Sequence, residues 1–275
     1  IHTYKKPFVL WGNGIVMGGG LGLMCGARHR VVTATSRIAM PEITIGLYPD
    51  VGGTWFLNRT PGKTGLFLAL TGASINAADA LFLGMADRFI AHEKYAEVLA
   101  ALAATTWSSD AAQHAGQVGH VLREFETHSK AQLPAQVVRE HYDLIQQLCD
   151  GDSIEAIVAN ILAYKNIDNK NGEDKWMEKA VKTLANGCPT SVYLIDEQFK
   201  RGKYLSLREA FKLELILSVN CMRFPNFREG VRALLIDKDH SPKFEPAKLG
   251  DVAAEFVEAH FVAPWGDAVN PLADL

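Results

Sequence analysis

The sequence of 275 residues lacks several features that would assign it to a specialised class of protein. Its four cysteines are spaced for neither a zinc ribbon nor a dense disulfide framework, so we expect a reducing compartment, the cytoplasm or the mitochondrial matrix in a eukaryote. Its 28 basic residues do not exceed its 31 acidic residues, which argues against a nucleic-acid partner. Its nine histidines form no His-Glu-x-x-His pair, so no metal site is expected.

One uncharged run, residues 7–27, is long enough to imitate a membrane span. Seven glycines and Asn13 interrupt this run, and glycine is a poor helix former. We therefore expect no membrane helix and no membrane partner. The composition, 48% hydrophobic and 21% charged, is that of a globular protein with a buried core.

Strands and helices are expected to alternate over residues 1–92, and residues 93–275 are expected to be mainly helical. A polar, glycine-bearing linker is expected over 166–175. Ser206 and Glu209 have the spacing of a capping box at a helix start. The expected strands are 8–11, 31–35 and 37–40. The expected helices are 21–27, one starting near Gly53, 77–86, 93–104, 144–164 and 205–222.

Three features that can carry chemistry fall within 32 residues: Gly18-Gly19-Gly20 before a helix, Glu42 after a strand, and Asp50 in the next loop. Glycines at a helix start let a ligand reach free backbone amides, which can stabilise an oxyanion. Each feature alone also has a structural interpretation. The triplet fits tight packing, Glu42 fits a surface loop, and Asp50 is well placed to cap the helix starting near Gly53.

Together these residues resemble the crotonase (enoyl-CoA hydratase/isomerase) superfamily. Its 3-hydroxyisobutyryl-CoA hydrolase branch is the closest match, on Pro49-Asp50-Val51-Gly52-Gly53 and on a distant block from Glu229 to Asp239. The resemblance spans nearly the whole chain. The superfamily segments are Lys6-Pro7, 11–14, 17–23, 40–42, 45–53 and 80–87, and the further branch segments are 189–191, 221–223 and 241–243.

The resemblance implies an α/β fold: a crotonase-like ββα spiral core, with the active site in its C-terminal part at 1–92, followed by a helical region at 93–275. In the family, a segment ahead of the position of Ile1 supplies the first strands, a second oxyanion amide and part of the CoA pocket. Because Ile1 is not an initiator residue, we expect the sequence to begin inside a longer protein.

The resemblance also implies roles for individual residues. Gly19, in the middle of the triplet, would donate one oxyanion-hole amide. Hydratases carry a carboxylate where this chain has Gly22, and a second one at Glu42. With one carboxylate absent and Asp50 present, the resemblance favours thioester hydrolysis over hydration. Glu42 would then act as general base or nucleophile, and Asp50 would accept a hydrogen bond from a substrate 3-hydroxyl.

The implied activity is hydrolysis of a short-chain 3-hydroxyacyl-CoA, such as 3-hydroxyisobutyryl-CoA in valine catabolism. No cofactor is expected, because coenzyme A is part of the substrate. Lys5, Lys6, Arg59 and Lys63 are candidate ligands for its phosphates, or ordinary solvated charges. Two alternatives stay open, an enoyl-CoA hydratase or isomerase and a non-catalytic acyl-CoA binding protein. A homo-oligomer is also left open.

Overall fold

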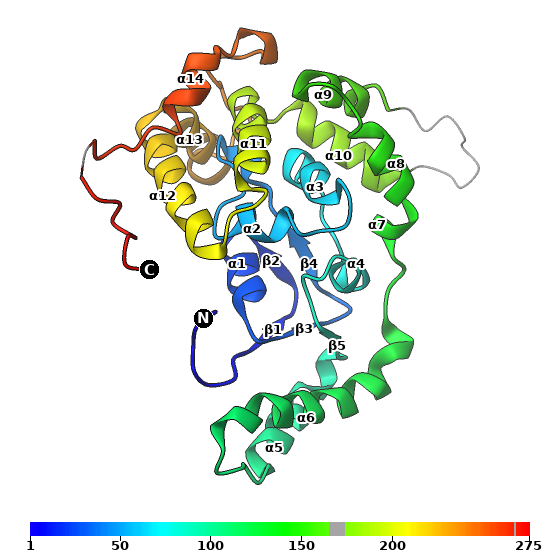
Figure 1. Cartoon of the computed structure of the whole chain (residues 1–275). Helices are drawn as coiled ribbons and strands as arrows, with labels where there is room; N and C mark the ends of the chain where they lie inside the picture. The colour runs from blue at the N-terminus through cyan, green and yellow to red at the C-terminus, as the bar shows by residue number, and fades with distance from the viewer. Residues whose placement is uncertain (165–173, 267) are drawn as a thin grey trace. The chain divides into compact units, whose positions relative to one another are not determined.

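A computed structural model of the protein describes residues 1–164, 174–266 and 268–275. The chain forms two compact units, residues 1–39 with 74–141 and residues 40–73 with 142–275. Neither unit is one continuous stretch, because the chain passes between them after residues 39, 73 and 141. Figure 1 gives the elements of both units in chain order.

The first unit contains two small parallel sheets (Figure 1). One sheet has the order β1-β3-β5, and the other pairs β2 with β4. Parallel pairing needs a crossover connection, and helix α1 lies in the chain between the paired strands β1 and β3. The strands are β1 (Val9–Gly12), β2 (Ile15–Met17), β3 (His29–Val32), β4 (Arg37–Ala39) and β5 (Arg88–Phe89). The helices are α1 (Gly19–Gly26), α4 (Ala77–Phe82), α5 (Tyr95–Ala104), α6 (His114–Ser129) and α7 (Val137–Glu140).

A buried apolar cluster joins the β1-β3-β5 sheet to α5 and α6. Val31 of β3 is fully buried in it, as is Leu122 of α6. Val98 of α5 packs on the same cluster at 2% exposure. β-branched and aliphatic side chains pack well on a pleated surface, so the burial of Val31 in this cluster favours strand formation at β3.

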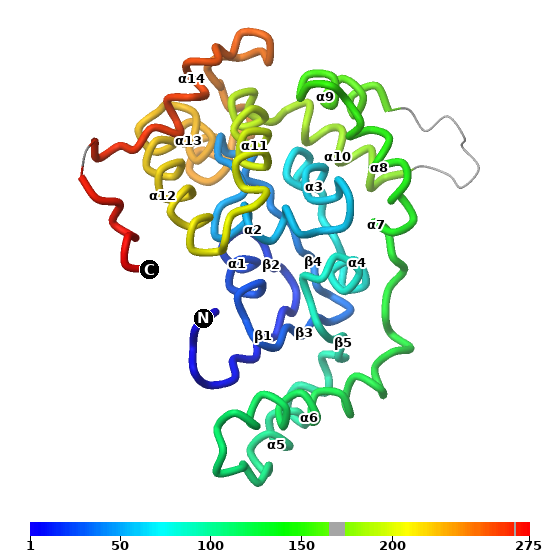
Figure 2. Tube along the Cα trace, viewed as in Figure 1, coloured from blue at the N-terminus to red at the C-terminus, as the bar shows by residue number. Residues whose placement is uncertain are grey.

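The second unit is helical apart from its connecting loops. It begins with a 3₁₀ turn, η1 (Glu42–Ile45), that directly follows β4 in the chain. Figure 2 shows α11, α12 and α13 following one another along the trace. Its helices are α2 (Gly53–Leu57), α3 (Thr64–Thr71), α8 (Tyr142–Leu148), α9 (Ile154–Leu162), α10 (Lys175–Ala185), α11 (Pro189–Gly202), α12 (Leu207–Arg223), α13 (Pro225–Val231) and α14 (Ala254–Ala259), with a π-helical turn η5 (Arg232–Ile236).

Helices late in the second unit pack directly on its early segments. Both α11 and α12 contact α2, and α13 contacts η1. The side chains of Ile43, Tyr48 and Phe67 lie fully buried in this unit. The segments that carry Glu42 and Asp50 are therefore supported by helices more than a hundred residues further along the chain.

The structure corrects one expected helix. The segment 144–164 forms two helices, α8 and α9, because Asp150-Gly151-Asp152 interrupts it. Ser153 then begins α9 as its N-cap, accepting a hydrogen bond from the Ala156 amide. The capping box of Ser206 and Glu209 is confirmed at the start of α12. The expected linker 166–175 falls outside the described residues, apart from 174 and 175 at the start of α10.

All four cysteines are free thiols. Burial raises the pKa of Cys25, Cys149 and Cys221 to about 12, so these thiols are protonated at neutral pH. Across the described ranges, no helix has both the length and the apolar character that crossing a membrane requires.

Candidate active site

Glu42 is the first residue of the η1 turn. Its backbone carbonyl accepts hydrogen bonds from the amides of Gly46 and Leu47, so the backbone forms a tight turn directly after Glu42. Gly46 ends the turn at φ 70°, a conformation that favours glycine. The Glu42 side chain is only 5% exposed, and its Oε2 has no hydrogen-bond partner. A buried carboxylate oxygen without a protein partner is free to bind a water molecule or a ligand.

The environment of Glu42 favours its neutral form. Burial raises the pKa of this carboxyl group to about 8, and the negative charge of Asp50 adds to the increase. A hydrogen bond from its own backbone amide opposes the shift only in part. A carboxylate with a pKa near the working pH is suited to act as a general base.

The η1 turn is held in place by residues far along the sequence. The amide of Cys188, at the start of α11, donates to the carbonyl of Ile43 at 2.9 Å. Gly230 of α13 lies so close that a Cβ there would approach backbone atoms of Ile45 to within 2.3–2.4 Å. Glycine at this position lets α13 contact the turn directly, and this contact fixes the backbone that carries Glu42.

Asp50 does not cap α2, so that expectation is wrong. The N-cap residue of α2 is Gly52, which has no side chain that could accept a capping hydrogen bond. The amides of Gly52 and Thr54 donate instead to the carboxylate of Glu214, at 2.7 and 2.9 Å. Because Glu214 takes these amides, the partly buried side chain of Asp50 is not used as a helix cap.

The charge of Asp50 acts on two buried carboxyl groups of this unit, Glu42 and Glu214. Burial raises the pKa of Asp50, and the charge of Asp50 in turn contributes to the raised pKa of both Glu42 and Glu214. Burial raises the pKa of Glu214 to about 7, although its bonds to Gly52 and Thr54 oppose the shift. The structure thus brings Glu42 and Asp50 into one electrostatically coupled group.

Glu214 is a site residue that the sequence reasoning missed. A signal was present, because Glu214 falls on the buried stripe of α12 that Ala210, Leu217 and Cys221 define at helical spacing. A glutamate on such a stripe is almost never buried without specific partners. An acidic residue at an apolar position of an otherwise regular helix therefore predicts a tertiary hydrogen bond.

Gly19 begins α1 in the first unit. Gly18 before it has φ 50° and ψ −121°, a conformation restricted to glycine. Gly19 and Gly20 are exposed, and amides of a first helical turn have no acceptor within the helix. The Gly19 amide is therefore available to a ligand, and its role in an oxyanion hole stays a prediction.

Two of the four candidate CoA phosphate ligands already have partners. Lys63 forms an ion pair with Asp150. The guanidinium of Arg59 stacks on the Trp55 ring at 4.3 Å and donates to the backbone carbonyl of Leu205. Lys5 and Lys6 are exposed residues of the first unit. Among the described residues, no group of three or more His, Cys, Asp or Glu side chains is arranged to hold a metal ion.

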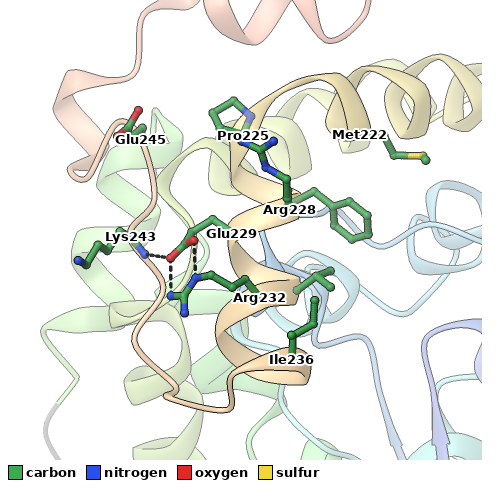
Figure 3. A pocket seen from close by; sticks show the side chains of 10 residues that line it. Met222, Pro225, Arg228, Glu229, Arg232, Ile236, Lys243 and Glu245 are labelled. Carbon is green, nitrogen blue, oxygen red and sulfur yellow. Dashed lines mark hydrogen bonds and ion pairs between the residues drawn. The ribbon is translucent and has the colours of Figure 1, made fainter.

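Part of the distant block 229–239 lines a surface groove (Figure 3), through Glu229, Val231, Arg232 and Ile236. In this groove the Glu229 carboxylate accepts hydrogen bonds from the Arg232 guanidinium and from the Lys243 backbone amide, all at 2.8 Å. Arg232 also pairs with Asp237 and Asp239 at 2.6 Å. Three carboxylates surround the charge of Arg232, so this residue is a structural centre of the block rather than a phosphate ligand.

The raised pKa of Glu42 predicts a specific dependence of stability on pH. Below pH 4.5 the carboxyl group is protonated in both the folded and the unfolded chain. As the pH rises towards 8, the unfolded chain ionises first, so the folded state binds more protons and loses relative stability. Glu42→Gln cannot titrate, so the decrease in unfolding free energy between pH 5 and 8 is expected to shrink by a few kcal/mol, about 1.4 for each pH unit of the shift.

Denaturant unfolding of both proteins at several pH values measures this difference. Glu214 remains in both proteins and contributes equally, so only the difference between the two slopes reports on Glu42. Parallel slopes would show that Glu42 ionises in the folded protein near its ordinary pKa.

The sequence and the fold were compared with known proteins. A family model described as Enoyl-CoA hydratase/isomerase matches residues 1–261. The chain is 40% identical over 261 residues to the mitochondrial 3-hydroxyisobutyryl-CoA hydrolase of Danio rerio, and 38% identical over 262 residues to that of Homo sapiens. Both alignments cover 95% of this chain but only 65% and 64% of those proteins, so the chain spans less than two thirds of their length.

Two solved structures resemble the chain closely. A carnitinyl-CoA dehydratase from Mycobacterium thermoresistibile superposes with a TM-score of 0.80 and 33% identity, covering 98% of this chain and 71% of that one. An enoyl-CoA hydratase from Rhodobacter sphaeroides 2.4.1 superposes with a TM-score of 0.78 and 33% identity, covering 96% and 71%. The similarity in sequence and the similarity in fold thus extend over nearly the same residues.

Proposed function

The chain belongs to the enoyl-CoA hydratase/isomerase family, and from that premise we propose that it hydrolyses a short-chain 3-hydroxyacyl-CoA thioester to the free acid and CoA. One observation carries the proposal: Glu42 is a buried carboxyl group with a partnerless oxygen, coupled to a second carboxyl group, Asp50. The curated relatives named as 3-hydroxyisobutyryl-CoA hydrolases support this substrate class. Their names also include the word mitochondrial, which makes the mitochondrial matrix a reasonable proposal for a eukaryotic source.

In the proposed reaction, two backbone amides donate to the thioester carbonyl oxygen, and the family resemblance implies that one of them belongs to Gly19. Ionised Glu42 removes a proton from a water molecule, and the resulting hydroxide attacks the carbonyl carbon. The tetrahedral intermediate collapses with loss of the CoA thiolate, which takes up a proton. Alternatively, Glu42 attacks the carbonyl carbon itself and displaces the CoA thiolate, which takes up a proton. Water then hydrolyses the resulting mixed anhydride, which releases the acid and regenerates the Glu42 carboxylate.

Asp50 would select the substrate. Its partly buried carboxylate is not needed to cap α2, so it can accept a hydrogen bond from the 3-hydroxyl group. A site with such an acceptor discriminates against substrates that lack the hydroxyl, because the acceptor is then left unpaired. Position 22, where hydratases carry a further carboxylate, is a glycine, which favours hydrolysis over hydration.

Release of free thiol from matched acyl-CoA pairs, with and without a 3-hydroxyl group, tests the proposal. The protein is expected to prefer the 3-hydroxy substrate. Asp50→Ala should remove that preference by reducing kcat/KM for the 3-hydroxy member about 10- to 100-fold more than for its partner, since the lost hydrogen bond involves a charged group. The plain acyl-CoA serves as the internal control for general damage.

Three outcomes would contradict parts of this scheme. Equal losses on both substrates would remove the role of Asp50. Consumption of an enoyl-CoA without thiol release would favour a hydratase or isomerase. Tight binding of acyl-CoA with neither reaction would favour a non-catalytic binding protein.

A further inference from the structure

Glu214 makes an unusual connection between two distant parts of the second unit. It lies in the middle of α12 and is only 4% exposed. Its Oε2 accepts a hydrogen bond from the Gly52 amide at 2.7 Å, and its Oε1 accepts one from the Thr54 amide at 2.9 Å. These amides lie at the N-terminus of α2, where a negative charge is favourable. Both oxygens of the carboxylate are therefore used to hold one short segment of backbone.

The segment that Glu214 holds has a strained backbone. Val51 has φ 52°, which is unfavourable for a β-branched residue, and Gly52 follows with φ 91°. Such a conformation persists only where the surroundings enforce it. The bond from Gly52 to Glu214 acts on the residue directly after Val51, and Asp50 lies directly before it. The direction in which Asp50 leaves the backbone thus depends on this enforced turn.

Further hydrogen bonds tie the same segment to α11 and α12. The Tyr48 hydroxyl donates to the backbone carbonyl of Glu214 at 2.7 Å. Gln198 of α11 donates from Nε2 to the Pro49 carbonyl at 2.6 Å and to the Thr54 hydroxyl at 2.7 Å. The backbone is therefore fixed on both sides of Asp50, and Glu214 is the member of this set that holds two backbone amides.

We propose that Glu214 is a positioning residue that sets the location of the Asp50 carboxylate, and thereby the preference of the site for 3-hydroxyacyl substrates. The part concerning substrate rests on the proposed function. Both carboxylate oxygens of Glu214 are bonded to the amides of Gly52 and Thr54, so Glu214 would act through the segment 48–54. The geometry supports this proposal on its own, because one of the two amide bonds lies within the strained turn, at Gly52, and the other follows it, at Thr54.

Glu214→Gln is the test variant, because glutamine keeps the shape but can accept only one of the two amide hydrogen bonds. Amide hydrogen exchange in residues 48–54 is expected to accelerate at least about tenfold, with little change in the other α12 contacts. In the same variant, the preference for the 3-hydroxyacyl over the plain acyl-CoA is expected to fall about tenfold, equivalent to the loss of one hydrogen bond to a charged group.

A double-mutant cycle with Asp50→Ala separates positioning from general damage. If Glu214 acts through Asp50, adding Glu214→Gln to Asp50→Ala leaves the substrate preference unchanged. Glu209→Gln is the matched control on the same helix, because glutamine also completes a capping box. If Glu214→Gln does not fold, Glu214→Asp keeps the charge but withdraws it by one methylene, and is measured in the same way.

The outcomes are distinguishable. Unchanged exchange in 48–54 overturns the proposal, whatever the activity. Faster exchange with additive effects on substrate preference also overturns it, because Glu214 would then act independently of Asp50. If the wild-type protein hydrolyses no thioester, the proposed function fails, and hydrogen exchange alone still decides whether Glu214 holds the segment.

Discussion

Replacing Glu42 with glutamine is expected to reduce thioester hydrolysis about 10³-fold or more while leaving the protein folded. Glutamine nearly matches the shape of the buried side chain, so the η1 turn is retained. Its amide, however, can neither remove a proton from water nor attack the thioester. Release of free thiol from a 3-hydroxyacyl-CoA at saturating substrate measures the loss, and denaturant unfolding verifies the fold.

Two further measurements make this prediction specific. Glu255→Gln alters an exposed carboxylate of α14 and is expected to retain full activity. In the wild-type protein, kcat/KM is expected to rise with pH up to about 8, because only the ionised Glu42 carboxylate is reactive and burial raises its pKa to about 8. Near-normal turnover by Glu42→Gln, or a wild-type rate that falls between pH 6 and 8, would refute the assignment.

Gly230→Ala is expected to destabilise the protein strongly. The added methyl group would lie within 2.3–2.4 Å of the backbone of Ile45. Backbone atoms cannot rotate away as a flexible side chain can, so α13 has to separate from the η1 turn. We expect a loss of about 3 kcal/mol in unfolding free energy, at the upper end for overpacking. Activity should fall with it, because η1 carries Glu42.

Gly116→Ala is the matched control for Gly230→Ala. Gly116 is an exposed residue of α6, and a Cβ there would meet no atom within 4 Å. Alanine is the better helix former, so this variant is expected to gain about 0.5–1 kcal/mol. A loss of unfolding free energy in Gly230→Ala together with a gain in Gly116→Ala would identify the close approach of α13 to η1 as the cause. If Gly230→Ala has the same unfolding free energy as the wild type, the contact between α13 and η1 can accommodate the added methyl group.

Much of the fold could be predicted from local patterns and from the family resemblance. The family is confirmed by the match over residues 1–261, and the crotonase-like α/β fold by the superposed structures. Strand β1, helix α1 and helix α12 were predicted to within a few residues. These elements carry strong local signals, namely a short apolar strand, a glycine triplet before a helix, and a capping box.

One error arose where a tertiary contact overrides local chemistry, and the other where one local signal outweighs another. Asp50 has the sequence position of a helix cap, but Glu214 occupies the amides from 162 residues away. The expected helix 144–164 was wrong for a local reason: the prediction followed the apolar periodicity, whereas the turn-forming Asp150-Gly151 interrupts the helix. The division of the chain at residue 92 stays a prediction about sequence organisation.

The distance along the chain between Asp50 and its support has a consequence for biosynthesis. Residues 52 and 214 are 162 positions apart, and translation at about 5–20 residues per second separates their emergence from the ribosome by about 10–30 seconds. Throughout that interval the nascent loop has no partner for its amides, and its acidic groups are hydrated and ionise as in any unfolded peptide. Glu42, Asp50 and Glu214 therefore acquire their raised pKa values only after most of the polypeptide has been made.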